Sequence, residues 1–202
     1  MSHLLRIFLL GTFLLVMVVG CSNSRQRLYV LAPLEDTQSY ETTASSENLT
    51  IGLGPIGVPD YLDRPQIVTR LSRNQLALAE LDKWALPLKE NISDVLAQNL
   101  SYLIPTDQVI PHPWGRSVTL DYQVTVNIIR FEATTDGRSE LIAWWQVLGS
   151  DGKTVLMHKQ SSFSETTKGT QHAAKVSAKN RALENLSREI AEGIKTLAEN
   201  DK

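Results

Sequence analysis

The stretch "DYQVTVNIIRFEATTDGRSELIAWWQVLGSDGKTVLMHKQ" (Asp121–Gln160) contains three strand-like runs separated by two strong turn signals. Asp136-Gly137 lies between the first two runs, and Asp151-Gly152 lies between the second and the third. Asp-Gly between alternating apolar residues is a strong hairpin signal. We therefore predict an antiparallel three-stranded meander. Alternation along its first strand places four apolar residues on one face: Tyr122, Val124, Val126 and Ile128.

Two adjacent tryptophans, Trp144 and Trp145, interrupt the alternation of the second run. Successive side chains of a strand point to opposite faces, so one ring is expected in the core and the other outside. The outward ring is consistent with edge-strand packing or with a binding contact.

Two amphipathic helices flank the meander in sequence. In "LPLKENISDVLAQNLSYLIP" (Leu86–Pro105), apolar residues recur every three or four positions, with Pro87 suited to the first turn and Pro105 to the end. A second helix is predicted from about Thr170 to Leu197, where Gly193 costs roughly 1 kcal/mol relative to alanine. The expected buried positions are Leu88, Ile92, Val95, Leu96, Leu100 and Leu103 in the first helix, and Val176, Leu183, Leu186, Ile190, Ile194 and Leu197 in the second.

Four shorter strand candidates precede the first helix, and a polar segment, Glu35–Asn48, reads as a loop. The candidates are "RLYVLAP" (27–33), "LTIGLG" (49–54), "QIVTRLS" (66–72) and "QLALAEL" (75–81). The order of strands, helix, meander and helix predicts a single α+β domain. We expect a mostly antiparallel sheet with two main helices packed on one face.

The N-terminus has the features of an export signal. Arg6 precedes an apolar run, Ile7–Val19, that is shorter than the roughly 20 residues of a membrane-spanning helix. The run ends in "VVGC", which resembles a bacterial lipobox, and Cys21 is the sole cysteine of the chain. We predict a signal peptide at 1–20, acylation of Cys21, a lipidated tether at 21–27 and a folded domain at 28–202. Ser22 replaces the aspartate that signals inner-membrane retention, which favours the outer membrane.

"GLGPIG" (Gly52–Gly57) matches G-x-G-x-x-G, a pattern that binds dinucleotide pyrophosphates when a helix begins at its third glycine. Here Pro59 and Pro65 occupy the place of that helix, and Pro55 removes an amide inside the motif. We therefore predict no dinucleotide binding. The alternative is a strand that ends in a glycine-rich bend.

Nothing in the sequence assembles a catalytic site. His112, His158 and His172 lack neighbours at metal-ligand spacing, and a formal net charge of −2 over 202 residues provides no broad field for nucleic acid. We predict no enzymatic activity, no cofactor and no metal.

The proline-bracketed loop from Val58 to Pro65 is a candidate partner-binding segment. Its prolines limit flexibility, which lowers the ordering cost of binding, and the candidate contact residues are Pro59, Tyr61 and Leu62. The alternative is that Tyr61 and Leu62 pack onto their own sheet.

Several segments together resemble the PqiC-like ABC-type transport auxiliary lipoproteins, which accompany MCE-type intermembrane lipid transporters. They are Cys21 in its lipobox, "LYVLAP" (28–33), "VPDYLDRPQIV" (58–68), "KWALPLKENISDVLAQNL" (83–100) and "ALENLSREIAEGI" (182–194). The loop motif and the "WALPL" helix start are the most specific pair.

The resemblance implies a non-enzymatic periplasm-facing lipoprotein with Cys21 as its acylated residue. It implies an MCE-domain protein that bridges the periplasm, and an inner-membrane transport component, as partners. Two functions fit. One is a docking subunit at the outer membrane, expected as a homo-oligomeric ring because MCE proteins form symmetric rings. The other is a lipid carrier, which needs an apolar cavity of about 300 Å³ or more.

Overall fold

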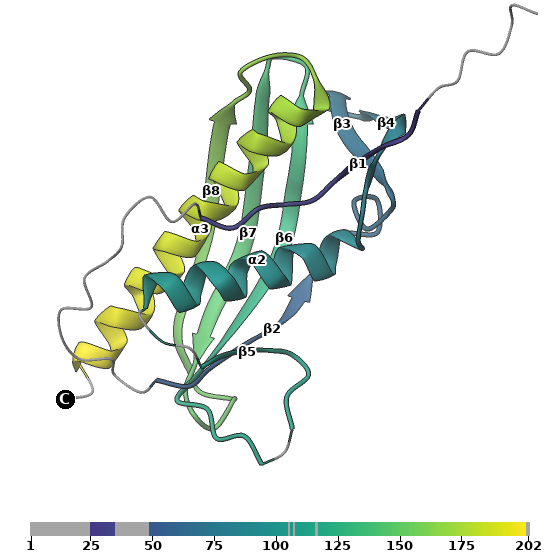
Figure 1. Cartoon of the computed structure of the whole chain (residues 1–202). Coiled ribbons are helices and arrows are strands. Elements are labelled where there is room, and N and C mark those ends of the chain that lie inside the picture. The colour runs from purple at the N-terminus through teal and green to yellow at the C-terminus, as the bar shows by residue number, and fades with distance from the viewer. Residues whose placement is uncertain (1–24, 35–48, 105, 107, 116, 201–202) are drawn as a thin grey trace, which may run out of the picture.

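A computed structural model describes residues 25–34, 49–104, 106, 108–115 and 117–200. The predicted signal peptide, Cys21 and the Glu35–Asn48 segment therefore lie outside the described residues. Within the described residues, eight strands form one sheet, and two helices lie on one of its faces (Figure 1). The predicted α+β class with two main helices is confirmed.

The meander runs from the central strand of the sheet, β6, to an edge strand, β8. β6 (Tyr122–Thr134), β7 (Arg138–Leu148) and β8 (Val155–Thr166) pair antiparallel, and Gly137 and Gly152 adopt the positive φ angles that such turns require. The four residues predicted on the inner face of β6 are all buried.

The rest of the sheet makes it mixed. β2 (Ile51–Gly57) and β3 (Gln66–Ser72) both pair parallel to the free edge of β6, β2 near its start and β3 near its end. β5 (Val109–Pro111) pairs parallel to β2, while β4 (Gln75–Trp84) pairs antiparallel to β3 and parallel to β1 (Arg27–Tyr29). Parallel pairing could not be read from the sequence because the turn signals specify only the hairpins.

The helices α2 (Leu88–Leu103) and α3 (His172–Asn200) cover the inner face of the sheet. Pro87, which the sequence placed in the first turn, is instead the N-cap residue of α2, one position before that turn. Nine of the twelve predicted apolar positions are less than 3% exposed, Val176 is 6% exposed, and Leu103 and Leu197 are half-buried.

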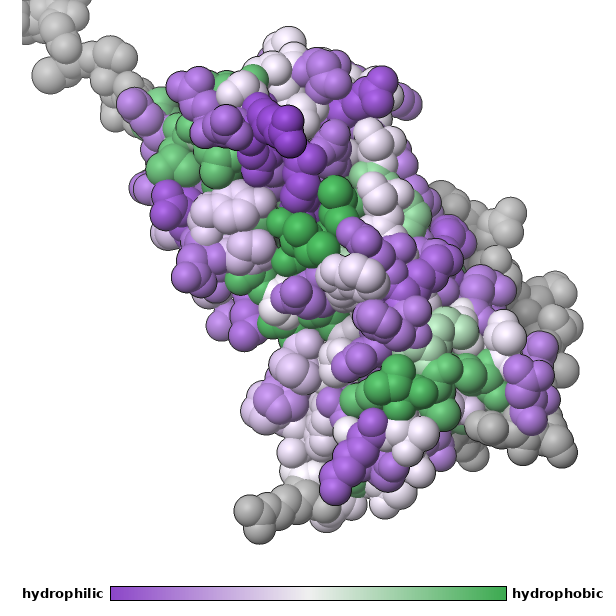
Figure 2. Space-filling model, turned by 180° about the vertical axis from the view of Figure 1, so that it is seen from behind, coloured by the Kyte–Doolittle hydropathy of each residue, from purple (hydrophilic) through white to green (hydrophobic). Residues whose placement is uncertain are grey.

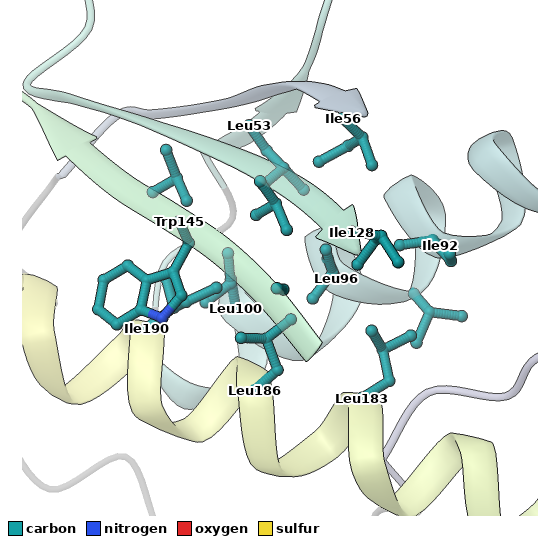
Figure 3. Packing of buried hydrophobic residues seen from close by; sticks show 14 of the residues in the cluster. Leu53, Ile56, Ile92, Leu96, Leu100, Ile128, Trp145, Leu183, Leu186 and Ile190 are labelled. Carbon is teal, nitrogen blue, oxygen red and sulfur yellow. The ribbon is translucent and has the colours of Figure 1, made fainter. Parts of the chain in front are cut away.

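The space between the helices and the sheet is filled by aliphatic side chains. Figure 3 shows Leu96 and Leu100 of α2 pointing toward Leu186 of α3 and toward the sheet. Trp145 joins this core while Trp144 is 40% exposed, which confirms the predicted split of the pair. A side chain at Gly193 would come within 2.8 Å of Met157 Sδ, so glycine permits the close approach of α3 to β8.

After β1, the chain crosses the outside of the helical layer (Figure 1). The backbone amides of Ala32 and Leu34 donate to the side-chain oxygens of Asn180 in α3 and Asn99 in α2, and Leu31, which precedes them, is 4% exposed. The N-terminal segment is thereby fixed to both helices. No helix in the described part of the chain is both long and apolar enough to cross a membrane.

Candidate functional site

The glycine-rich segment lies within a strand. β2 continues through Gly57, so the predicted bend after the strand is instead a register shift inside it, between Leu53 and Ile56. Gly54 has φ +127°, and a side chain there would come within 2.6 Å of His112 Cβ. Turns, not a helix, follow Gly57, so the described backbone provides no helix N-terminus for a pyrophosphate.

The three histidines lie apart and have different neighbours. His112 meets Trp114 edge-on, His158 stacks on the exposed Trp144, and His172 Nδ1 lies 3.3 Å from Asp82. Within the described residues, no group of three His, Cys, Asp or Glu side chains is placed to hold a metal ion.

The Val58–Pro65 loop connects β2 to β3 and passes beside the part of β6 that neither strand pairs. Leu62 is 1% exposed and belongs to the core. Tyr61 is half-buried, and its hydroxyl donates to the carbonyl of Ile129 (3.3 Å) and to Glu132 Oε2 (3.1 Å). Pro59 is half-buried, and its carbonyl accepts the amides of Leu62 and Asp63. These contacts favour the alternative in which Tyr61 and Leu62 pack onto their own sheet.

Glu132 is the centre of a buried charged cluster beneath this loop. It is 0% exposed and accepts hydrogen bonds from Arg70 Nε (2.5 Å), Arg130 Nε (3.3 Å) and the Phe131 amide (3.0 Å). Burial alone would raise the pKa of Glu132, but the hydrogen bond from Arg70 and the nearby positive charges outweigh it, and the pKa is lowered. The carboxylate therefore stays ionised inside the fold and fixes the loop, β3 and β6 to one another.

Lys179 of α3 reaches the same region from the helical layer. It is 1% exposed, its Nζ donates to the carbonyl of Phe131 (2.6 Å), and it lies 4.7 Å from the centre of that ring. Burial lowers the pKa of Lys179 to about 7, although the negative charge of Glu132 acts to raise it. Sequence reasoning missed both residues. Helical spacing could have placed Lys179 on the buried stripe, since it lies between Val176 and Leu183.

The two most specific motifs of the sequence meet in space. The Trp84 amide donates to the Pro65 carbonyl (2.7 Å), which brings the end of the loop against the start of the "WALPL" segment. Between them lies an open depression of about 400 Å³, lined by Asp63–Pro65 and Trp84–Pro87. We call it the junction groove. Leu86 on its wall is 40% exposed.

The junction groove lies close to the N-terminal strand. The Ala85 amide donates to the Tyr29 carbonyl (2.9 Å), and Tyr29 pairs with Trp84 in the parallel register of β1 and β4. Asp82, which is 3% exposed, accepts from Arg27 Nη2 (2.7 Å) and the Tyr29 hydroxyl (2.8 Å). These bonds hold the pKa of Asp82 below its usual value although burial acts to raise it. The groove and β1 are thus parts of one hydrogen-bonded corner of the domain.

Two further depressions are open to solvent and have charged or polar linings. One, of about 360 Å³, lies between β2 and the start of α2 and includes Lys89, Glu90 and Asp94. The other, of about 340 Å³, lies beside the crossing segment and includes Arg181 and Arg188. All three depressions exceed the volume that we required of a carrier. They lie on the surface, however, and side chains fill the space between the helices and the sheet (Figure 3).

Comparison with known proteins gives the chain its family. A family model described as the ABC-type transport auxiliary lipoprotein component matches residues 29–191. The intermembrane transport lipoproteins PqiC of Escherichia coli K12 and of Shigella flexneri are 26% identical over 189 residues, which cover 93% of this chain and 97% of each relative.

Solved structures agree with the fold. A Xanthomonas campestris protein superposes with a TM-score of 0.71 at 16% identity, over 87% of this chain and 98% of that one. An uncharacterised protein superposes with a TM-score of 0.69 at 19% identity, over 84% and 99%. The family match spans most of the chain, so this protein belongs to the ABC-type transport auxiliary lipoproteins.

Proposed function

We propose that this protein is an outer-membrane lipoprotein, acylated at Cys21 and facing the periplasm, that serves as a non-enzymatic docking subunit of an MCE-type intermembrane lipid transport system. The family description and the intermembrane transport function in the names of its relatives support a transport role. The sequence features around Cys21 support the anchor.

The observation that carries the docking role is the junction groove. It is formed by the two motifs on which the family resemblance most depends, which lie at the two ends of the β3–β4 hairpin. It combines the exposed Leu86, beside the buried Trp84, with the charged residues Asp63 and Arg64. An apolar centre beside charged groups is the composition of a protein-binding site. The partner is an MCE-domain protein that spans the periplasm, together with its inner-membrane transport component.

The docking role includes assembly of several copies. A symmetric MCE tube presents the same surface repeatedly, and a homo-oligomeric ring of this lipoprotein matches that symmetry through head-to-tail interfaces. Each tether would hold one subunit close to the membrane around the mouth of the tube.

A lipid carrier is the second candidate, because the junction groove is large enough for part of an acyl chain. We favour docking, since the groove is open and the interior is filled by side chains such as Leu96 and Leu186. A carrier needs to shield its lipid from water.

Affinity purification of the full-length acylated protein from its native membranes tests both roles. Docking predicts an MCE-domain protein in the eluate, and Cys21→Ala is expected to remove the protein from the outer-membrane fraction, since stable attachment takes two or more acyl chains. Native mass spectrometry of the eluted protein distinguishes the carrier. One lipid bound per chain, besides the acyl groups on Cys21, in the absence of any MCE-domain protein would contradict docking.

A further inference from the structure

The most exposed large apolar side chain in the described part of the molecule lies at its N-terminal end. Leu28 of β1 is 62% exposed, Val30 just after it is 52% exposed, and Leu81 of β4 is 36% exposed. Burying such side chains is favourable, so an exposed group of them marks a contact with something apolar. We call these three residues the N-terminal apolar surface.

Strand register shows which way these side chains point. Leu28 pairs with Lys83 in the parallel ladder of β1 and β4, and Leu81 is two residues from Lys83, so Leu28, Leu81 and Lys83 point to the same face. Val30 directly follows β1. Arg27 and Tyr29 point to the other face, where they bind the buried Asp82. Figure 2 shows an apolar area on the outer face of the sheet near β1, with hydrophilic surface around it.

This surface is held at a fixed place close to the predicted anchor. Leu28 is the seventh residue after Cys21, and seven residues extend to at most about 25 Å. The ion pair of Arg27 with Asp82 and the paired register of Leu28 with Lys83 fix β1 to the domain. Leu28 therefore moves only together with the whole domain, which the short tether keeps close to the bilayer.

The charge around the surface suits a membrane. Arg25 is exposed four residues from Cys21, and Lys83 lies on the same face as Leu28 and Leu81. Basic side chains that flank apolar ones are the usual combination of proteins that lie on a bilayer containing anionic lipid.

We propose that the N-terminal apolar surface rests on the lipid bilayer, with Leu28, Val30 and Leu81 in the headgroup region and Arg25 and Lys83 at lipid phosphates. This proposal rests on the acylation of Cys21 put forward above. It adds a second membrane contact that sets the orientation of the domain. The sheet edge with β1 faces the membrane, and the β7–β8 hairpin, at the other end of the molecule in Figure 1, faces away.

The sole cysteine makes the test specific, because an acylated Cys21 leaves no free thiol. Leu28→Cys and Leu81→Cys each provide one labelling site for an environment-sensitive fluorophore. Val155→Cys and Leu156→Cys are the controls, since these residues are 53% and 40% exposed and lie at the start of β8, just after the β7–β8 turn. The full-length acylated proteins are reconstituted into vesicles of phosphatidylcholine and phosphatidylglycerol, with and without lipids that carry a quencher near the headgroup.

We expect a blue-shifted emission and strong lipid-dependent quenching at positions 28 and 81, and neither at 155 and 156. Equal quenching at the two ends of the molecule would overturn the proposal. So would labels at 28 and 81 that are shielded from water but not quenched by lipid, because that result assigns the surface to contact between copies.

Mass spectrometry of the same samples separates this proposal from the anchor. Absence of acyl groups on Cys21 overturns both. Acylated protein that floats with the vesicles but shows no quenching at position 28 overturns only the orientation proposed here.

Discussion

The apolar core between the helices and the sheet differs from the charged cluster around Glu132, although both are buried. The core is continuous and aliphatic, and α2, α3, β6 and β7 all contribute to it (Figure 3). The cluster lies where the edge of β6 is left unpaired between β2 and β3. Tyr61 and Lys179 donate to backbone carbonyls of β6 there, and Arg70 pairs with the Glu132 carboxylate. The comparison shows that non-directional packing stabilises the body, whereas specific polar contacts fix the loop that forms the junction groove.

The largest effect is expected where the cluster loses its central charge. Glu132→Ala leaves the partly buried Arg70 without its anion and removes the acceptor of the Phe131 amide. Breaking a buried ion pair in this way costs about 3–5 kcal/mol of unfolding free energy. Urea denaturation followed by circular dichroism measures it. A loss below about 1 kcal/mol would mean that solvent reaches the cluster.

The core provides the matching test. Leu100→Ala removes a side chain that is 0% exposed between α2 and α3, and we expect a loss of about 2–5 kcal/mol in the same assay. Leu156→Ala is the control, since Leu156 is 40% exposed, and it should change stability by less than about 0.5 kcal/mol. Similar losses in both variants would contradict the assignment of Leu100 to a tightly packed core.

The pH dependence of the unfolding free energy distinguishes the charged cluster, which contains Lys179, from the apolar core. The Lys179 pKa of about 7 in the folded chain lies below the usual 10.5, so between these values the unfolded chain binds more protons and stability rises with pH. Below pH 7 both states are protonated and this contribution is constant. We expect a rise of about 1 kcal/mol per pH unit above pH 7.5 in the wild type, and none from this group in Lys179→Met. Denaturation at several pH values measures both slopes, and parallel slopes would refute the assignment.

Tyr61→Phe gives the smallest effect and sharpens the role of the loop. It removes only the hydroxyl that donates to the Ile129 carbonyl and to Glu132, with an expected loss of about 0.5–1.5 kcal/mol. Capture of the partner should be unchanged, because this hydroxyl points into the cluster. Loss of capture without loss of stability would return Tyr61 to the partner-binding role that the sequence suggested.

The same two regions differ in how far the sequence predicts them. Helical spacing identified Leu96, Leu100, Leu183 and Leu186, because one-sided burial imposes a period that a single sequence displays. Hairpin signals placed β6, β7 and β8 for a similar local reason.

The cluster could not be predicted in this way. The register shift of β6 between Ile128 and Arg130 changes which side chains face inward, so Phe131 and Glu132 are both buried. Its partners Arg70 and Lys179 come from distant elements, and no local pattern pairs them. The motifs that form the junction groove were visible in the sequence, but their contact through Trp84 and Pro65 was not.

Capture of the MCE-domain protein by two matched variants tests the docking account most directly. Leu86 lies on the wall of the junction groove, and Leu156 lies at the start of β8, just after the β7–β8 turn. Both are leucines with 40% exposure. Full-length acylated Leu86→Glu and Leu156→Glu are purified from native membranes, and the MCE-domain protein that co-purifies is quantified. With both variants folded and membrane-bound, we predict a loss of about tenfold or more for Leu86→Glu and wild-type recovery for Leu156→Glu. Equal recovery with both would contradict docking through the junction groove.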